Sequence, residues 1–146
     1  MKFSCAIFAV TLFVSCRIYA IEAVETVSYE SRFDPWRANN YALKPAAKGD
    51  ADAQTAFFLS TYVRLSQPYA GGEDLEQMTA NVRELLKALG DVAFAKAIQS
   101  LRPEVRSSVR WFVEMKSVRA SSPKTYKVLN AAPKIDWPTD QAIREN

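Results

Sequence analysis

Apolar residues recur at helical spacing along most of the chain, most regularly over residues 73–89. Drawn as a helix, this segment places its apolar side chains within about 100° of one another; they are Leu75, Met78, Val82, Leu85, Leu86 and Leu89. Its charged side chains fall on the opposite face. The pattern predicts an amphipathic helix that ends at Gly90, because glycine readily adopts the backbone conformation that terminates helices.

Two helices are predicted before this one. Asp34 is a good N-cap and Pro35 suits a first helical position, so a helix is expected over residues 36–48. Pro45 should kink this helix or confine its regular part to the residues before Lys44, because proline removes a hydrogen bond and clashes with the preceding turn.

The second of these helices is predicted over residues 51–66. Gly49 is expected to end the preceding helix, and Asp50 is expected to cap the start of this one. It is apolar around nearly its whole circumference, which favours burial on several sides. We therefore expect it to be the central helix.

Beyond the amphipathic helix, Asp91 is expected to cap a short helix over residues 92–101. Pro103 marks the start of the next helix, which we expect to continue to the residues before Pro123. The inward stripe of that helix is formed by Val105, Val109, Phe112 and Val113.

Residues 123–146 contain three prolines and no sustained apolar period. We predict an extended tail whose apolar side chains pack across the helices, namely Tyr126, Val128, Leu129, Ile135 and Trp137. The predicted fold class is all-α: a small helical bundle, or two stacked helical hairpins, over residues 24–122, followed by this tail.

The N-terminal segment has the parts of a secretory signal peptide. Lys2 gives the positive start, the apolar run of residues 3–14 is too short to span a membrane, and Ala20 or Ala23 offers a cleavage site. We predict that residues 1–20 are removed and that the protein is periplasmic or secreted. The FVSC sequence ending at Cys16 also resembles a bacterial lipobox, so a lipid anchor at that cysteine stays open.

The composition excludes several kinds of chemistry after cleavage at either alanine. The sequence has no histidine, and its two cysteines, Cys5 and Cys16, both lie in the signal segment. Ser–His and Cys–His nucleophiles, histidine-bearing zinc sites and disulfides are therefore excluded. We expect no cofactor, no metal and no enzymatic activity.

A hydrolase that uses two carboxylates is the competing class, because such an enzyme needs two acids about 5–10 Å apart. Glu30 and Asp34 are the best candidate pair. Asp34 capping a helix at the surface would count against this class. Asp50 and Asp52 are predicted to serve a helix N-terminus rather than to bind a metal.

Positive charge is concentrated in residues 102–127, which contain seven basic and two acidic residues. Removal of residues 1–20 leaves 17 basic and 16 acidic residues, so the overall charge predicts no nucleic-acid binding. Arginine and exposed aromatic side chains are typical of protein interfaces. We predict a protein-binding surface formed by Arg102, Arg106, Arg110, Trp111, Tyr126 and Trp137. The alternative is a solvated helix face in which Arg110 pairs with Glu114.

The stretch from Lys44 to Tyr62 is similar to part of a Sel1-like repeat, a relative of the tetratricopeptide repeat. Gly49, Ala53, Gln54 and Phe57 fit the family's pattern, whereas Phe58 stands where the family has a small glycine. A second Gly-Asp pair follows 41 residues later, a plausible repeat spacing. The resemblance implies helical hairpins and a protein-binding scaffold.

Taken together, these patterns lead us to expect an exported protein-binding module with an unidentified protein partner. An inhibitor or immunity-type protein acting in the cell envelope is the narrower hypothesis. The alternatives are the carboxylate-dependent hydrolase and an envelope-assembly component anchored through Cys16.

Overall fold

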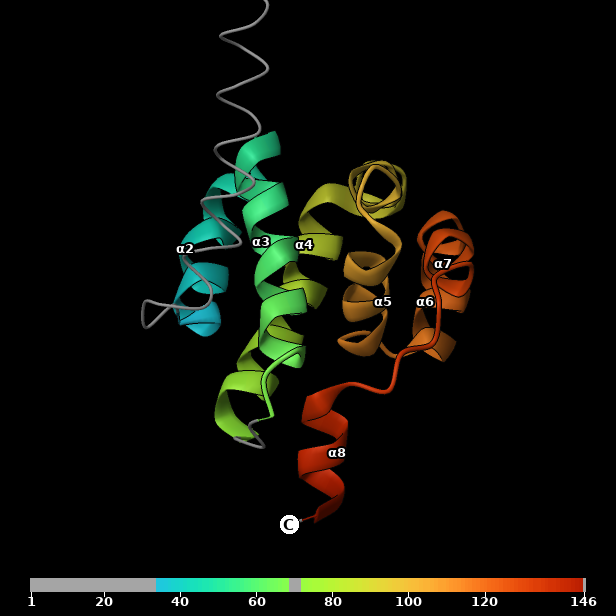
Figure 1. Ribbon diagram of the computed structural model, residues 1–146. Coiled ribbons are helices and arrows are strands. Elements are labelled where there is room, and N and C mark those ends of the chain that lie inside the picture. Colours follow the sequence, from blue (N-terminus) through green and yellow to red (C-terminus); the bar gives the residue numbers. More distant parts are fainter. Residues whose placement is uncertain (1–33, 69–71, 146) are drawn as a thin grey trace, which may run out of the picture. The chain divides into compact units, whose positions relative to one another are not determined.

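The computed structural model describes residues 34–68 and 72–145, and every regular element in these two ranges is an α-helix. In chain order the helices are α2 (Pro35–Ala47), α3 (Ala51–Leu65), α4 (Gly72–Gln99), α5 (Pro103–Trp111), α6 (Met115–Ser121), α7 (Pro123–Asn130) and α8 (Pro138–Glu145) (Figure 1). The predicted all-α fold is confirmed. The signal segment, Cys16 and Glu30 lie outside the described residues.

Helices α2 and α3 form a hairpin whose turn follows the predicted capping. Asp34 Oδ1 accepts hydrogen bonds from the backbone N–H groups of Trp36 and Arg37, at 3.0 and 3.2 Å. Gly49 has a φ of 92°, and Asp50 Oδ1 accepts the N–H of Ala53 at 2.9 Å. Local capping groups therefore define where α2 begins and where the turn passes into α3.

The predicted extent of the first helix is confirmed, but the alternative that its regular part stops before Lys44 is wrong, because α2 runs on through Pro45 to Ala47. Proline at position 45 leaves the carbonyl of Tyr41 without its helical donor. Tyr41 is 81% exposed, so water can reach this part of the helix and the loss is small.

Helix α3 is the central helix, as predicted, since it packs against α2, α4, α5 and α8. Phe57 and Phe58 on α3 are both fully buried. The ring of Phe58 meets that of Phe94 from α4 edge to face, with centroids 5.5 Å apart. Phe58 therefore fills the place between α3 and α4, rather than allowing the close approach that a small residue would permit.

Buried polar side chains join the first three helices. Asn39 of α2 donates to the hydroxyl of Ser60 on α3 at 3.0 Å, and Asn81 of α4 donates to Asn39 Oδ1 at 2.8 Å. All three side chains are almost completely buried. Because unpaired polar groups are costly in a core, this chain of bonds fixes the relative register of the helices.

Helix α4 has a kink at Gly90, where φ is 73° and ψ is 169°. The predicted break is thus present, although the two helical parts follow each other without a loop. The prediction that Asp91 caps the second part is wrong. Its carboxylate instead accepts the backbone N–H groups of Lys124 and Thr125 at the start of α7, at 3.0 and 2.7 Å.

The single helix expected between Pro103 and Pro123 is two helices. The break covers residues 112–114, where Glu114 has an extended backbone with a ψ of 102°. Phe112 and Val113 at the break are both buried, and so is Val118 on α6. The change of direction allows all three apolar side chains to reach the core.

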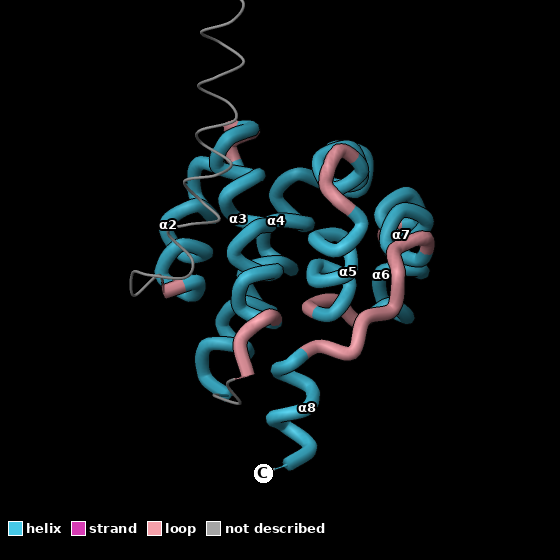
Figure 2. The backbone as a smooth tube through the Cα atoms, in the orientation of Figure 1, coloured by secondary structure: helices cyan, strands magenta, loops and turns pink. Residues whose placement is uncertain are grey.

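The prediction of an extended tail is wrong, because residues 123–146 contain α7 and α8. Pro123 and Pro138 each stand at the first position of a helix, where proline is favoured rather than disruptive. The expected packing of the tail is confirmed, since Leu129 and Trp137 are buried in the common core. Figure 2 shows the non-helical segment, residues 131–137, that leads from α7 to α8.

Helix α8 is anchored to α3 through Arg64, a side chain that is only 1% exposed. Arg64 forms an ion pair with Asp74 of α4 and donates to the hydroxyl of Thr139 at 3.2 Å. The same hydroxyl donates to the carbonyl of Gln67 at 2.8 Å. Charged and polar contacts therefore join α3, α4 and α8.

Candidate functional site

The six residues of the predicted binding surface have different environments in the structure. Arg110 Nη1 donates to the carbonyls of Leu129, Asn130 and Ala132, at 3.3, 3.4 and 3.5 Å. Leu129 and Asn130 are the last residues of α7, and Ala132 follows the helix directly. Arg110 is therefore a structural clamp between α5 and α7.

The alternative pairing of Arg110 with Glu114 is also not formed. Helix α5 ends at Trp111, so the two residues are not one turn apart on a common helix. Glu114 instead accepts the hydroxyl of Ser117 at 2.8 Å.

Both tryptophans of the predicted surface serve the fold. Trp111 is half-buried and its Nε1 donates to Asp140 Oδ1 of α8 at 2.7 Å. Trp137 is only 4% exposed and meets the ring of Tyr62 edge to face, with centroids 5.8 Å apart. Trp137 is thus enclosed by the fold, whereas Trp111 keeps a partly exposed ring.

Two further members of the predicted set lie at or near the surface in separate places. The guanidinium of exposed Arg102 stands 5.9 Å from the ring centroid of Tyr62. The guanidinium of Arg119 lies 5.7 Å from the ring centroid of half-buried Tyr126. Such contacts stabilise exposed cations modestly and do not by themselves define a site.

Arg106 lies in the wall of a groove between α4, α5 and α7 that has a volume of about 510 Å³. The groove is lined by four cationic side chains, Lys96, Arg106, Lys124 and Lys127. None of its lining residues is acidic. We call this hollow the basic groove.

The cations of the basic groove form no close ion pair within the described residues, although the Lys124 charge acts on the nearby carboxylate of Asp91. Arg106 Nη1 donates to the carbonyl of Gln99 at 3.1 Å, while its buried Nε has no acceptor. A guanidinium offers five donor protons, and the terminal Nη groups of Arg106 keep donors beyond the one given to Gln99.

A second hollow, of about 570 Å³, differs in its charge. Its lining includes Arg83 and Lys87 but also Asp91 and Glu114. Charges of both signs compensate one another there. The basic groove is consequently the more selective environment for an anionic group.

Sequence reasoning missed the groove because its cations come from distant parts of the chain. Lys124 and Lys127 belong to the basic segment that we identified, but they were assigned to an extended tail. Lys96 precedes that segment. Only the packing of α4 against α7, which Asp91 secures, brings these side chains beside Arg106.

The acidic residues considered above have structural roles. Asp34 caps a surface helix, the outcome that counts against its use as a catalytic acid. Asp50 caps α3, and Asp52 lies in its first turn, as predicted. In the described part of the chain, no three His, Cys, Asp or Glu residues form a group that could hold a metal ion.

The pKa of Asp91 reflects its role as a cap. Partial burial raises the pKa of this carboxyl, but the N–H groups of Thr125 and Lys124, together with the Lys124 charge, lower it below the ordinary value. The ion pair with Arg144 lowers the pKa of Asp136 in the same direction. Both carboxyls stay ionised at neutral pH.

Comparisons with protein families, with curated proteins and with solved structures each find no match for this chain. The Sel1-like resemblance therefore stays a prediction. None of the described helices is both long enough and apolar enough to cross a membrane.

Proposed function

We propose that this protein is an exported binding module that recognises a protein partner through the basic groove. The observation that carries the proposal is the convergence of four cations from three helices on one groove without a lining carboxylate. Unpaired like charges repel one another, so their accumulation is unfavourable unless a partner of opposite charge compensates them.

The apolar part of the groove supports a protein partner. Val92, which is 61% exposed, and Ala95 line it from α4, and Val128 and Ala131 line it from α7. An apolar floor with a charged rim is the usual anatomy of a protein interface. Within this proposal, the partner is a protein of the cell envelope that the module inhibits or neutralises.

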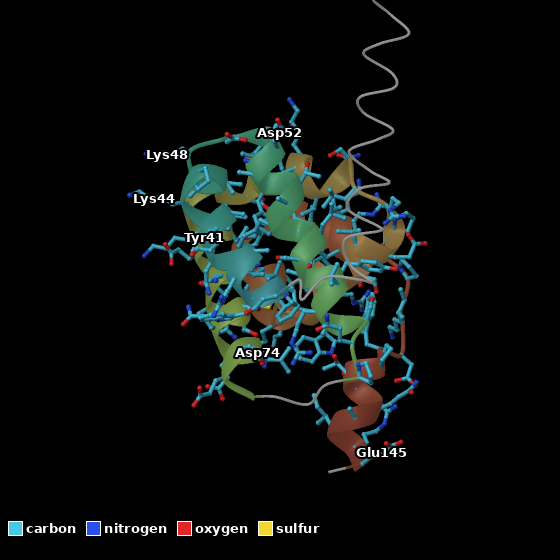
Figure 3. The ribbon with its side chains drawn as sticks, turned by 60° about the vertical axis from the view of Figure 1, so that its left-hand side comes forward. Tyr41, Lys44, Lys48, Asp52, Asp74 and Glu145 are labelled. Carbon is cyan, nitrogen blue, oxygen red and sulfur yellow. The ribbon has the colours of Figure 1, made fainter. Side chains whose placement is uncertain are left out.

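Photo-crosslinking in living cells tests the proposal. A photo-crosslinking amino acid replaces Val92 at the groove, and in the control variant it replaces Tyr41, the most exposed large apolar side chain of α2 (Figure 3). We expect a crosslinked protein with the label at Val92 and none at Tyr41. Mass spectrometry of the product then identifies the partner and its contact peptide.

Two results would contradict the proposal. A crosslink from Tyr41 but not from Val92 would mean that the binding surface lies elsewhere. A crosslink from Val92 that persists when Arg106 and Lys127 are both replaced by glutamate would mean that the charges of the groove do not contribute.

A further inference from the structure

We infer that the basic groove takes a short acidic peptide segment, in which carboxylates alternate with apolar side chains. The inference rests on the proposed function and adds the chemistry of the bound segment. It depends on how charge, apolar surface and unused hydrogen-bond donors are arranged within the groove.

The cations occupy different walls of the groove. Lys96 comes from α4 and Arg106 from α5, whereas Lys124 and Lys127 lie one turn apart on α7. Carboxylates along an extended segment can therefore pair with cations on more than one side. The under-used guanidinium of Arg106 suits a carboxylate best, because its planar donors match the two carboxylate oxygens.

The backbone of α7 does not provide the anion site. The N–H groups of Lys124 and Thr125 are already occupied by the carboxylate of Asp91. Binding in the groove thus depends on side chains, and single substitutions can test it.

The lining favours a peptide over other anions. Val92 and Val128 offer apolar surface that a bare phosphate group would leave uncovered. Proteins that bind single-stranded nucleic acid use aromatic platforms, and no aromatic residue lines this groove. A volume of about 510 Å³ suits a few side chains rather than a folded domain.

Fluorescence anisotropy with the processed protein tests the inference. The probe is a fluorescein-labelled Glu-Leu-Glu-Glu-Leu-Glu peptide, and the reference probe has glutamine in place of each glutamate. We expect saturable binding of the first probe, weakened as salt rises, and at least about tenfold weaker binding of the second.

Matched variants locate the site. The Lys124→Gln/Lys127→Gln variant and the Arg106→Gln variant should each bind the acidic probe about tenfold more weakly. The Lys44→Gln/Lys48→Gln variant removes the same charge from exposed lysines on α2 (Figure 3) and should change binding less than about twofold. The Val92→Thr variant should weaken binding by a few fold, because it removes apolar surface while it keeps the side-chain shape. Thermal unfolding checks that each variant is folded.

Each contrary result has a distinct meaning. Equal binding of the acidic and the glutamine probe overturns the inference. So does a loss of binding in the Lys44→Gln/Lys48→Gln variant as large as the loss in the groove variants. Binding of inorganic phosphate or of anionic lipid vesicles, lost in the groove variants while the acidic probe does not bind, overturns it in favour of a different ligand. If a groove-dependent crosslinked partner is found and the probe does not bind, the proposed function stands and this inference fails. If the probe binds but substitutions in the groove leave crosslinking of the partner unchanged, the proposed function fails.

Discussion

At the scale of single residues, the carboxylate of Asp91 stabilises a helix that begins more than thirty residues later. Its two oxygens accept the backbone N–H groups of Lys124 and Thr125. In the same way Arg64, Asp74 and Thr139 join parts of the chain that are far apart.

Replacing Asp91 tests this cap. We expect Asp91→Ala to lower the free energy of unfolding by about 1 kcal/mol at pH 7, the usual value of a lost cap. Since the folded state lowers the pKa of Asp91, its contribution is present above the unfolded value near pH 4 and is lost as the pH falls through the folded value. Urea unfolding should therefore show that the difference in the free energy of unfolding between wild type and Asp91→Asn is smaller at pH 3 than at pH 7. A difference of constant size would mean that the charge of Asp91 does not contribute.

At the scale of helices, the kink in α4 depends on the backbone of Gly90. A φ of 73° with a ψ of 169° is open almost only to glycine, and an added Cβ would meet no atom within 4 Å. We expect Gly90→Ala to lower the free energy of unfolding by about 1–3 kcal/mol through backbone strain alone. Gly72→Ala, in the first turn of the same helix and equally free of contacts, is the control and should be neutral or slightly stabilising. Equal effects in thermal unfolding would contradict this explanation.

The clamp between α5 and α7 allows a direct comparison of two arginines one turn apart. Arg110→Gln removes the donor from the last carbonyls of α7 and should lower the free energy of unfolding by about 1–2 kcal/mol. Arg106→Gln should change it by less than about 0.5 kcal/mol, because its one bond, to Gln99, is exposed. The effects on binding should be reversed: Arg106→Gln should bind the groove probe about tenfold more weakly, and folded Arg110→Gln should bind it as the wild type does. Chemical unfolding and anisotropy on the same samples measure both effects.

At the scale of the whole molecule, the predicted export has a simple measurement. N-terminal sequencing of the protein recovered from outside the cytoplasm should begin at Ile21 or Val24, as cleavage after Ala20 or Ala23 requires. A chain that begins at a lipid-modified Cys16 would instead establish the lipoprotein alternative. A chain that retains Met1 in the cytoplasm would contradict the proposed location.

Local signals predicted most of the helices, and tertiary contacts account for the differences. Asp34, Gly49 and Asp50 act on neighbouring residues, so their capping roles were visible in the sequence. The break between α5 and α6 has no proline or glycine to mark it and follows from the burial of Phe112 and Val113. Helices α7 and α8 were missed although proline begins both, because their short apolar periods were too weak to recognise.

The candidate site was predicted less well for a related physical reason. The basic segment was found, and Arg106 in it does line the groove. The separate roles of Arg110, Trp111 and Trp137 depend on partners in α7, α8 and α3, which spacing along the sequence does not reveal. A binding surface that three helices build together becomes visible only when they are packed.

The buried Arg64 also determines the order in which the molecule can be completed. Its contact with Thr139 spans 75 positions along the chain, whereas the α2–α3 hairpin needs only neighbours. During synthesis the residues of the α2–α3 hairpin become available early, and Thr139 is added much later. The guanidinium of Arg64 therefore gains its hydroxyl partner only after the hairpin can have formed. A chain that lacks α8 would keep the ion pair between Arg64 and Asp74 but would lose the Thr139 hydroxyl as a partner of Arg64, a loss that lowers stability and favours proteolysis. The stabilising contribution of α8 thus falls on a buried side chain that belongs to another helix.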